Sequence, residues 1–241
     1  MKNEMKILFA TPCYGGLINS RTALNYIEVV KELDKRKIKH DIKFLVNSSL
    51  VTKGRNILTA HMLEDKSFTH LMFIDADMGF HTSTFFKLLD LDKHVVGCPY
   101  PAKLINWGKM YKNIDNIKSP NDLIKNSVNH VGYPLPIENL KNNKCEKTDF
   151  LGTGFMLIKR EVFIEMMDNE PKKFYKPDYP TTAFRFKNKK HYAFFENGIV
   201  DGNYRGEDYH FCEKWRKMGG NIWIFHCKLG LSHIGSHEFV S

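Results

Sequence analysis

The chain has 241 residues, of which 42% are hydrophobic and 13% aromatic, enough for one sizeable core. Lysine and arginine exceed aspartate and glutamate by 36 to 27, and this charge of +9 favours anionic partners such as nucleic acid, acidic membranes or phosphorylated small molecules. Five scattered cysteines without a C-x-x-C argue against a disulfide framework or a structural zinc site, and no apolar run suits a secretory signal or a membrane span, so we expect a soluble, cytoplasmic protein.

The first hundred residues alternate between expected strands and helices. Strands are expected at 6–12, 41–47, 70–77 and 94–101. Helices are expected after an N-cap at Ser20, at 51–65, and after an N-cap at Thr82 or Ser83 as far as Leu89. The first helix spaces four apolar residues for one buried face, and the strand after it alternates three more. These are Leu24, Ile27, Val30 and Leu33 in the helix, and Ile42, Phe44 and Val46 in the strand.

The pattern predicts an α/β fold with a mostly parallel central sheet flanked by helices, Rossmann-like and in a single domain. Ligands of such sheets bind beyond the carboxyl ends of the strands. Within residues 1–241 we expect a nucleotide-binding half at 1–102 and an acceptor-binding half at 103–241.

The second half is less regular. The polar segment 103–148 predicts long loops, and the aromatic, basic segment 169–205 suggests a region that covers substrate. Between them, residues 150–167 predict a strand with two glycines and then a helix. Near the end, Phe211, Cys212, Trp215 and Met218 form a helical stripe that Gly219 and Gly220 terminate before a strand at 221–225.

Two carboxylates follow the most apolar strand, in "HLMFIDADMGF". If the segment is extended, Asp75 and Asp77 point to one face and Ala76 to the other. Such close carboxylates repel each other unless a cation lies between them, and Mg²⁺ or Mn²⁺ commonly joins carboxylates to substrate phosphates. The pattern therefore indicates a metal–diphosphate site, although a bare D-x-D also occurs by chance in surface turns.

With its context, "FIDADM" resembles the D-x-D motif of GT-A-fold glycosyltransferases. "FLGTGFMLIKREVF", "GEDYHFCEKWRKMGGNIWI" and "LGLSHIGSHEF" follow in the order found in family 2-like members, particularly small bacterial and viral ones. The resemblance implies a Mn²⁺- or Mg²⁺-dependent enzyme that transfers a sugar from a nucleoside-diphosphate donor, expected to be a UDP-sugar, to a glycan or other hydroxyl acceptor. The family 2-like pattern favours inversion, while a retaining enzyme could carry the same D-x-D. A viral member would act in the host cytoplasm.

The resemblance also implies roles for individual residues. Asp77 and His233 would hold the metal, with His237 as the rival histidine, and Asp77 would reach the diphosphate of the donor through that metal. Asp75 would contact the nucleotide ribose or the metal, and Ala76 would lie beside the donor. Asp208 would be the general base, and Glu207 would bind the acceptor or substitute as base. The remaining nucleotide-sugar contacts would come from Thr11, Pro12, Tyr14, Arg55, Asn56, Gly152 and Gly154. Tyr100 and Lys103 could line the acceptor pocket, and Trp107, Phe194 and Phe195 could stack on sugar rings.

Simpler explanations exist for several of these residues. Arg55 could be a surface cation, Glu207 and Asp208 could merely favour a helix N-terminus, and the two glycines could serve a tight bend.

Other functions compete with this one. A sugar-nucleotide nucleotidyltransferase would need a G-x-G-x-R loop that "TPCYGGLINSR" lacks, and no P-loop occurs. A nucleic-acid-binding module would suit the charge and "FKNKKHYAFF", but it leaves the paired aspartates unexplained, so we expect no nucleic-acid partner. A carbohydrate-binding relative without turnover is the third alternative.

Overall fold

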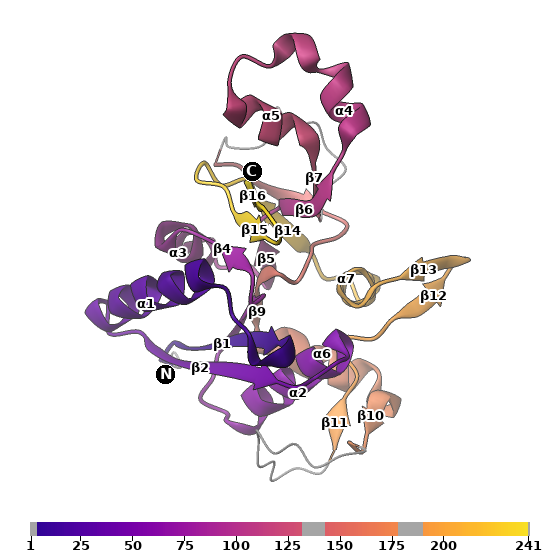
Figure 1. Ribbon diagram of the computed structural model, residues 1–241. Helices are drawn as coiled ribbons and strands as arrows, with labels where there is room; N and C mark the ends of the chain where they lie inside the picture. Colours follow the sequence, from indigo (N-terminus) through magenta and orange to yellow (C-terminus); the bar gives the residue numbers. More distant parts are fainter. Residues whose placement is uncertain (1–3, 132–142, 178–189, 241) are drawn as a thin grey trace.

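A seven-stranded sheet forms the centre of the computed structural model, which describes residues 4–131, 143–177 and 190–240 (Figure 1). The strand order is β2-β1-β3-β9-β5-β14-β8. The strands are β1 (Lys6–Cys13), β2 (Lys39–Val46), β3 (His70–Ile74), β5 (Val95–Gly97), β8 (Cys145–Thr148), β9 (Phe155–Lys159) and β14 (Ile222–Phe225). The pairings make β9 and β8 antiparallel to the others, so the sheet is mixed although most of its strands run in one direction.

Helices cover both faces of this sheet. The covering helices are α1 (Ser20–Lys35) and α3 (Thr82–Asp90) on one face, and α2 (Val51–Glu64), α6 (Arg160–Asn169) and α7 (Glu207–Lys217) on the other. Successive strand residues alternate between the two cores: Ile7 and Phe9 pack with α1 and α3, whereas Leu8 and Ala10 pack with α2, α6 and α7. The predicted α/β class, with one central sheet flanked by helices in a single domain, is confirmed. Strands β8, β9 and β14 come from residues 103–241, so both predicted halves build the same sheet.

Residues 100–131 form a projecting lobe where we predicted loops from 103 onward (Figure 1). The lobe consists of β6 (Tyr100–Ile105), α4 (Trp107–Lys112), the 3₁₀ turn η2 (Ile114–Asn116), α5 (Pro120–Ser127) and β7 (Val128–Val131). Its helices begin at local caps: Asn106 accepts a hydrogen bond from the Lys109 N–H at 2.8 Å, and Ser119 precedes Pro120. The loop prediction is therefore wrong over most of 103–131 and again at β8, because short capped helices need little apolar periodicity. Residues 132–142 lie outside the described part.

The predicted covering segment at 169–205 contains short elements in its described parts, 169–177 and 190–205. They are the 3₁₀ turn η4 (Pro171–Lys173), β10 (Phe174–Tyr175), β11 (His191–Tyr192), β12 (Gly198–Val200) and β13 (Asn203–Arg205). Strand β10 pairs with β11, and β12 pairs with β13 in a hairpin that extends beside α7 (Figure 1). Residues 178–189 lie outside the described part.

Half of the predicted buried face of the first helix is wrong, although Leu33 is buried and Val30 half-buried. Leu24 and Ile27 are exposed, and the buried stripe instead includes Thr22, Asn25 and Tyr26. The Asn25 side chain accepts a hydrogen bond from the backbone N–H of Phe80 at 2.9 Å, so polar residues serve the interior here. The N-cap is Asn19 rather than Ser20.

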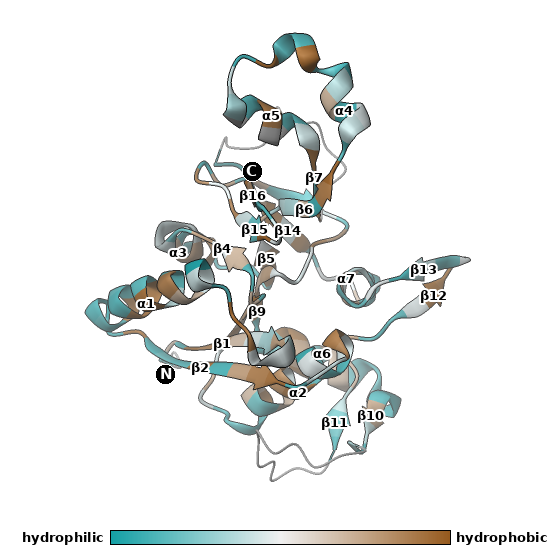
Figure 2. Ribbon diagram, viewed as in Figure 1, coloured by the Kyte–Doolittle hydropathy of each residue, from teal (hydrophilic) through white to brown (hydrophobic). Residues whose placement is uncertain are grey.

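The strand predicted at 41–47 is confirmed as β2. Because β2 lies at the end of the sheet, Phe44 and Val46 are exposed although its second half is hydrophobic (Figure 2). Helix α3 begins after His81, which provides no side-chain cap, rather than after Thr82 or Ser83. The expected strand at 94–101 is two strands, because the chain leaves the central sheet between β5 and β6.

The predicted helix near the end is confirmed as α7, which buries Phe211, Cys212 and Trp215. Gly219 follows it with φ +91°, the left-handed conformation that favours glycine after a helix, and β14 comes next. The predictions of α2, and of β9 followed by α6, are also confirmed. None of the helices in the described ranges has the length and apolar character that crossing a bilayer requires.

A small antiparallel sheet connects the end of the chain to the middle of the fold. It has the order β16-β15-β4 and consists of β4 (Met78–Gly79), β15 (Ser232–Ile234) and β16 (Glu238–Val240). Its register places His233 opposite Met78, and the backbone N–H of Ile234 donates to the Asp77 carbonyl at 2.8 Å. This pairing brings the histidine segment beside the D-x-D segment.

Candidate functional site

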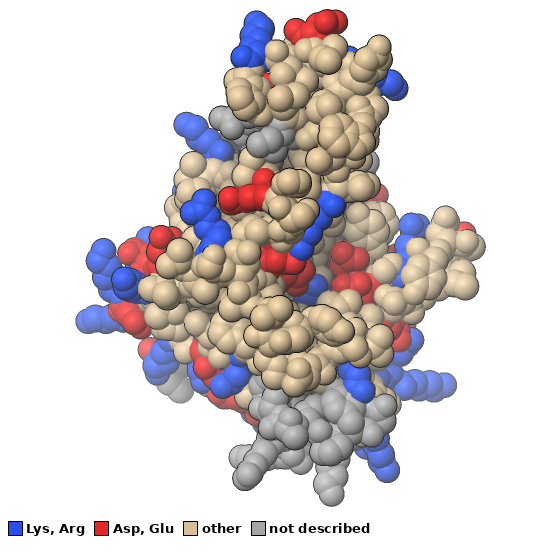
Figure 3. All heavy atoms as spheres, viewed as in Figure 1, with Lys and Arg blue, Asp and Glu red and all other residues tan. Residues whose placement is uncertain are grey.

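Five segments meet at the carboxyl edge of the parallel strands. Strand β3 ends there, the glycine loop 152–154 enters β9 there, and α2 and α7 both begin there. Strand β15 supplies the fifth segment through its pairing with β4. Figure 3 shows acidic and basic side chains together in the hollow at the middle of this face. This is the edge at which α/β sheets bind ligands.

We predicted that the two aspartates lie on an extended strand, and this prediction is wrong. Strand β3 ends at Ile74, and the Met78 N–H donates to the Asp75 carbonyl at 3.2 Å to close a turn. The segment leaves the ladder with β9 to pair with β15, so the same-face argument fails. Asp75 faces Arg55, whereas Asp77 faces Lys103 and His233.

Arg55 is the buried cation of the site. It lies near the start of α2 with 2% of its surface exposed, which excludes the surface-cation explanation. Its Nη2 donates to Asp75 Oδ1 at 2.9 Å, and its Nε lies 3.4 Å from Glu207 Oε1. Burial lowers the Arg55 pKa, but Asp75 and Glu207 outweigh this effect and the net pKa is raised. One guanidinium thus joins the D-x-D turn to α7.

Asp77 lies between two basic side chains. Lys103 Nζ donates to its Oδ2, and His233 Nε2 lies 3.3 Å from its Oδ1. Burial raises the Asp77 pKa, but the contacts with His233 and Lys103 outweigh it, and the net pKa is lowered. Asp77 is therefore an anion at neutral pH.

Asp77 and His233 fit as a pair of metal ligands. The Nδ1 of His233 is 2.9 Å from the Pro101 carbonyl, which can only accept, so Nδ1 carries the proton. With a proton on Nε2 as well, His233 donates to Asp77, which is the contact that lowers the Asp77 pKa. In the neutral ring Nε2 has a lone pair instead, so that Asp77 and His233 could share a cation, with Nδ1 held by a carbonyl as in many metal-bound histidines. In the described ranges no three His, Cys, Asp or Glu side chains group as a metal site. Asp75, the third predicted ligand, is engaged by Arg55 instead and stays a prediction. Mg²⁺ and Mn²⁺ commonly complete such a shell with water and phosphate oxygens.

Asp208 is the carboxylate best suited to accept a proton. It lies in the first turn of α7, where the Tyr209 N–H donates to its Oδ1 at 2.8 Å. Burial and the neighbouring charge of Glu207 raise its pKa to about 6, and they outweigh the hydrogen bonds and the influence of Arg55. A pKa near the working pH is what general-base catalysis needs. Simple helix capping does not account for this shift.

The glycine loop makes room for Tyr100. A Cβ at Gly152 would lie 2.2 Å from the Tyr100 hydroxyl, and one at Gly154 would lie 2.8 Å from that oxygen and 3.1 Å from Asp75 Oδ2. The Gly154 N–H donates to the hydroxyl at 3.1 Å, and its carbonyl accepts from the Asp75 N–H at 3.0 Å. The glycines thus serve a close approach between protein groups, while their predicted contact with the sugar stays a prediction.

Replacing Gly152 with alanine should lower the free energy of unfolding by about 1 to 3 kcal/mol, because the new methyl group overlaps Tyr100 and Val131 in a packed region. Urea denaturation measures the loss. Gly108→Ala in α4 is the control: its nearest atom is 3.6 Å away, so we expect no loss or a small gain. Equal stability of the two variants would contradict the packing argument.

The other predicted contacts lie at the rim or inside the core. Thr11 is buried and its hydroxyl bonds that of Tyr26 at 2.6 Å, whereas Pro12 is half-buried and Tyr14 is exposed in the 3₁₀ turn η1 (Tyr14–Gly16). Ala76 accepts the Asn19 N–H at 2.7 Å.

Asn56 is engaged on both sides of its amide. The nitrogen donates to the Phe195 carbonyl at 2.8 Å, and the oxygen accepts the Phe195 N–H at 2.9 Å. These contacts give Asn56 a structural role, and its nucleotide contact stays a prediction. Phe194 and Phe195 belong to the core, so they cannot stack on a sugar, whereas Trp107 is exposed on the lobe. His237 is exposed and packs edge-on to Phe239 rather than beside Asp77.

Sequence reasoning underestimated Tyr100 and Lys103. We predicted both only as parts of an acceptor pocket, but Lys103 contacts Asp77, and Tyr100 lies against His233 with the rings 5.4 Å apart. The sequence signal for these two residues was the change from an apolar strand to "CPYPAK" directly beyond the edge of the sheet. Pro99 favours an extended chain that leaves the sheet at that edge.

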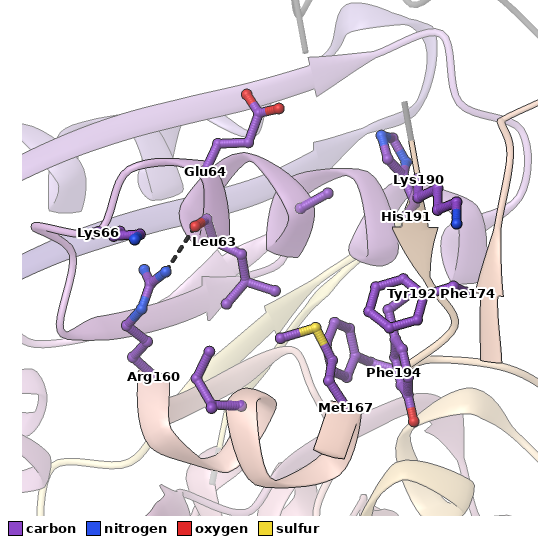
Figure 4. Close-up of a pocket in the computed structure, with 12 residues that line it drawn as sticks. Leu63, Glu64, Lys66, Arg160, Met167, Phe174, Lys190, His191, Tyr192 and Phe194 are labelled. Carbon is purple, nitrogen blue, oxygen red and sulfur yellow. Dashed lines mark hydrogen bonds between the residues drawn. The ribbon is translucent and has the colours of Figure 1, made fainter. Parts of the chain in front are cut away.

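A cavity of about 470 Å³ lies at the opposite edge of the sheet, between α2, α6 and β11 (Figure 4). Figure 4 shows Arg160 pointing at the end of α2, where it donates to the Leu63 carbonyl at 2.7 Å. The same guanidinium bonds the Met62 and Asp65 carbonyls, so it serves as a helix cap. Phe194, which we predicted as a stacking residue, is among the residues that line this cavity, but none of the residues predicted to bind the metal or the nucleotide, or to act as the base, lines it.

No family model and no curated protein matches the sequence. Among solved structures, the chain is similar to A197 from STIV, known from a crystal structure, with a TM-score of 0.48 and 18% identity. The similarity covers 95% of this chain and 86% of A197. A likeness this distant leaves ligand and activity to be argued from the site itself.

Proposed function

We propose that the protein is a metal-dependent glycosyltransferase that transfers a sugar from a nucleoside-diphosphate donor, expected to be a UDP-sugar, to a hydroxyl acceptor. One observation carries the proposal. Four carboxylates from two distant segments, Asp75 and Asp77 from one and Glu207 and Asp208 from the other, gather beyond the carboxyl ends of the parallel strands, and the buried Arg55 joins the two segments by pairing with Asp75 and Glu207. The central sheet agrees with the resemblance to GT-A enzymes.

The charges of the cluster favour a bound cation. The four carboxylates face two permanent cations, Arg55 and Lys103, so the cluster has an excess of negative charge. A divalent ion would offset that excess and allow an anionic diphosphate to approach. Asp77 and His233 are the residues that would hold Mn²⁺ or Mg²⁺, with the imidazole oriented by the Pro101 carbonyl. When bound, the ion supplies charge stabilisation for the leaving diphosphate.

The chemistry that this assigns to the chain is an in-line displacement. Asp208 takes the proton of the acceptor hydroxyl while the oxygen of that hydroxyl bonds to the anomeric carbon of the donor sugar. The bond from the anomeric carbon to the diphosphate breaks at the same time. Attack from the face opposite the leaving group inverts the anomeric configuration. Arg55 keeps Asp75 and Glu207 in place, and Lys103 adds positive charge beside Asp77.

A thermal-shift panel of nucleotide sugars, with and without Mn²⁺, tests the proposal. We expect UDP or one UDP-sugar to raise the melting temperature only when Mn²⁺ is present, because a ligand of the folded state stabilises it by mass action. Asp77→Asn should remove that shift. Asp92→Asn is the matched control, since Asp92 pairs with Lys159 at the other edge of the sheet. If the Asp77 variant responds like the control, the metal assignment is wrong.

A further inference from the structure

Tyr100 is a buried polar residue between the two acidic segments of the site. It opens β6 with 5% of its surface exposed, and its ring packs against Gly152, Gly154 and His233. Burial raises the pKa of the Tyr100 hydroxyl well above its usual value, and the negative charges of Asp75 and Asp208 raise it further. The phenol is therefore neutral at physiological pH and retains its proton.

The surrounding backbone is shaped for this ring. Both glycines approach it more closely than any side chain would allow, as the 2.2 and 2.8 Å contacts at their Cβ positions show. The Gly154 N–H occupies one lone pair of the hydroxyl at 3.1 Å. The position of the oxygen is thus set by the G-T-G loop and not only by side-chain packing.

The proton of this hydroxyl is available to a ligand. In the described part of the chain, the Gly154 N–H is the hydrogen-bond partner found for the Tyr100 hydroxyl, and the hydroxyl is the acceptor in that bond. A buried O–H without an acceptor costs free energy, and a bound ligand that accepts it would relieve the cost. The oxygen lies beside Asp75, the carboxylate of the donor side, and within the field of Asp208, the proposed base.

We infer that Tyr100 contacts the transferred sugar, with its O–H donating a hydrogen bond to a hydroxyl or ring oxygen of that sugar in the space between Asp75 and Asp208. The inference rests on the proposed function and goes beyond it by naming the residue that distinguishes a nucleotide sugar from a bare nucleotide. A site built to donate to a substrate oxygen discriminates strongly against a ligand that lacks it.

The test compares Tyr100→Phe with the parent protein, using UDP and a panel of UDP-glucose, UDP-galactose and UDP-N-acetylglucosamine in Mn²⁺. The phenyl ring keeps the packing against the glycine loop and removes only the hydroxyl. Calorimetry should give the same UDP dissociation constant within about twofold, whereas affinity for the best UDP-sugar, or its rate of UDP release, should fall by about tenfold. The ratio of the two affinities does not depend on the folded fraction, so partial unfolding cannot imitate the result.

Tyr192→Phe is the matched control. It also removes a buried phenol hydroxyl, one that donates to the Met166 carbonyl at 2.9 Å far from the site, and it should leave both affinities unchanged. Unchanged binding and turnover in Tyr100→Phe would overturn the inference, as would an equal loss for UDP and UDP-sugar. If the parent protein binds neither UDP nor any UDP-sugar with Mn²⁺, the proposed function itself fails, which is a distinguishable result.

Discussion

Asp208→Asn should reduce sugar transfer by about 10²- to 10⁴-fold while the Mn²⁺-dependent thermal shift with UDP is retained. The amide cannot take the proton of the acceptor hydroxyl, but its size and its place in α7 are those of the carboxylate. UDP release with the donor and an acceptor glycan measures the loss. Asp201→Asn, in the exposed turn between β12 and β13, is the control and should transfer at the parent rate.

The transfer rate of the parent enzyme should depend on pH in a way that also reflects Asp208 acting as the base. A base must be deprotonated to act, so the rate should rise with pH through the Asp208 pKa of about 6 and level off above it. An Asp208→Asn variant that still transfers at the parent rate, or a parent profile that is flat between pH 5 and 7, would remove Asp208 from the base role.

Asp208→Asn should also stabilise the fold above pH 6. Because the folded-state pKa is raised above the ordinary value of 3.8, folding favours the protonated form, and ionisation costs up to about 3 kcal/mol. This cost is absent below about pH 4 and complete above about pH 6, so the melting-temperature gain of the variant should appear over that interval. Lower stability combined with lost activity would instead indicate a structural role.

The elements that sequence alone predicts best are those whose burial has a simple period. The apolar run of β3 and the stripe of α7, closed by Gly219, carry their own start and stop signals. The buried face of α1 could not be predicted in this way. A hydrophobic pattern assigns Leu24 and Ile27 to that face, but the helix buries Thr22 and Asn25 instead. Hydrogen bonds to distant backbone, such as that from Phe80 to Asn25, leave no periodic trace.

The acidic residues of the candidate site were predicted from the sequence, but the ion pairs that they form were not. Asp75 and Asp77 stand out because carboxylates at the end of an apolar strand are unusual. Glu207 and Asp208 were predicted from the resemblance, since acids are common in the first turn of a helix. Which cation faces which acid depends on long-range pairing: β15 must lie beside β4 before His233 can meet Asp77. The turn at the D-x-D segment has the same origin, since the chain leaves one sheet there and joins another.

Arg55→Met should produce the largest loss of stability of any single change at the site, about 3 to 5 kcal/mol in the free energy of unfolding. Methionine roughly fills the space and can keep the contact with Phe73, whose ring lies 5.3 Å from the guanidinium carbon. It leaves Asp75 and Glu207 without their shared cation in a partly buried place, and that uncompensated charge dominates the effect. Urea denaturation at pH 7 measures it.

A second substitution separates lost charge balance from lost packing. In the double variant Arg55→Met, Asp75→Asn, one of the stranded charges is gone, so part of the stability should return, and a double-mutant cycle gives the coupling energy. Acid should likewise narrow the gap between Arg55→Met and the parent, because protonated carboxyls no longer require the guanidinium. Arg36→Met is the surface control: Arg36 pairs with Glu32 at 2.9 Å across one helical turn, and its loss should cost under about 0.5 kcal/mol. If Arg55→Met costs no more than Arg36→Met, the four carboxylates do not depend on a buried cation, and the charge argument for a metal and a diphosphate at this site fails with it.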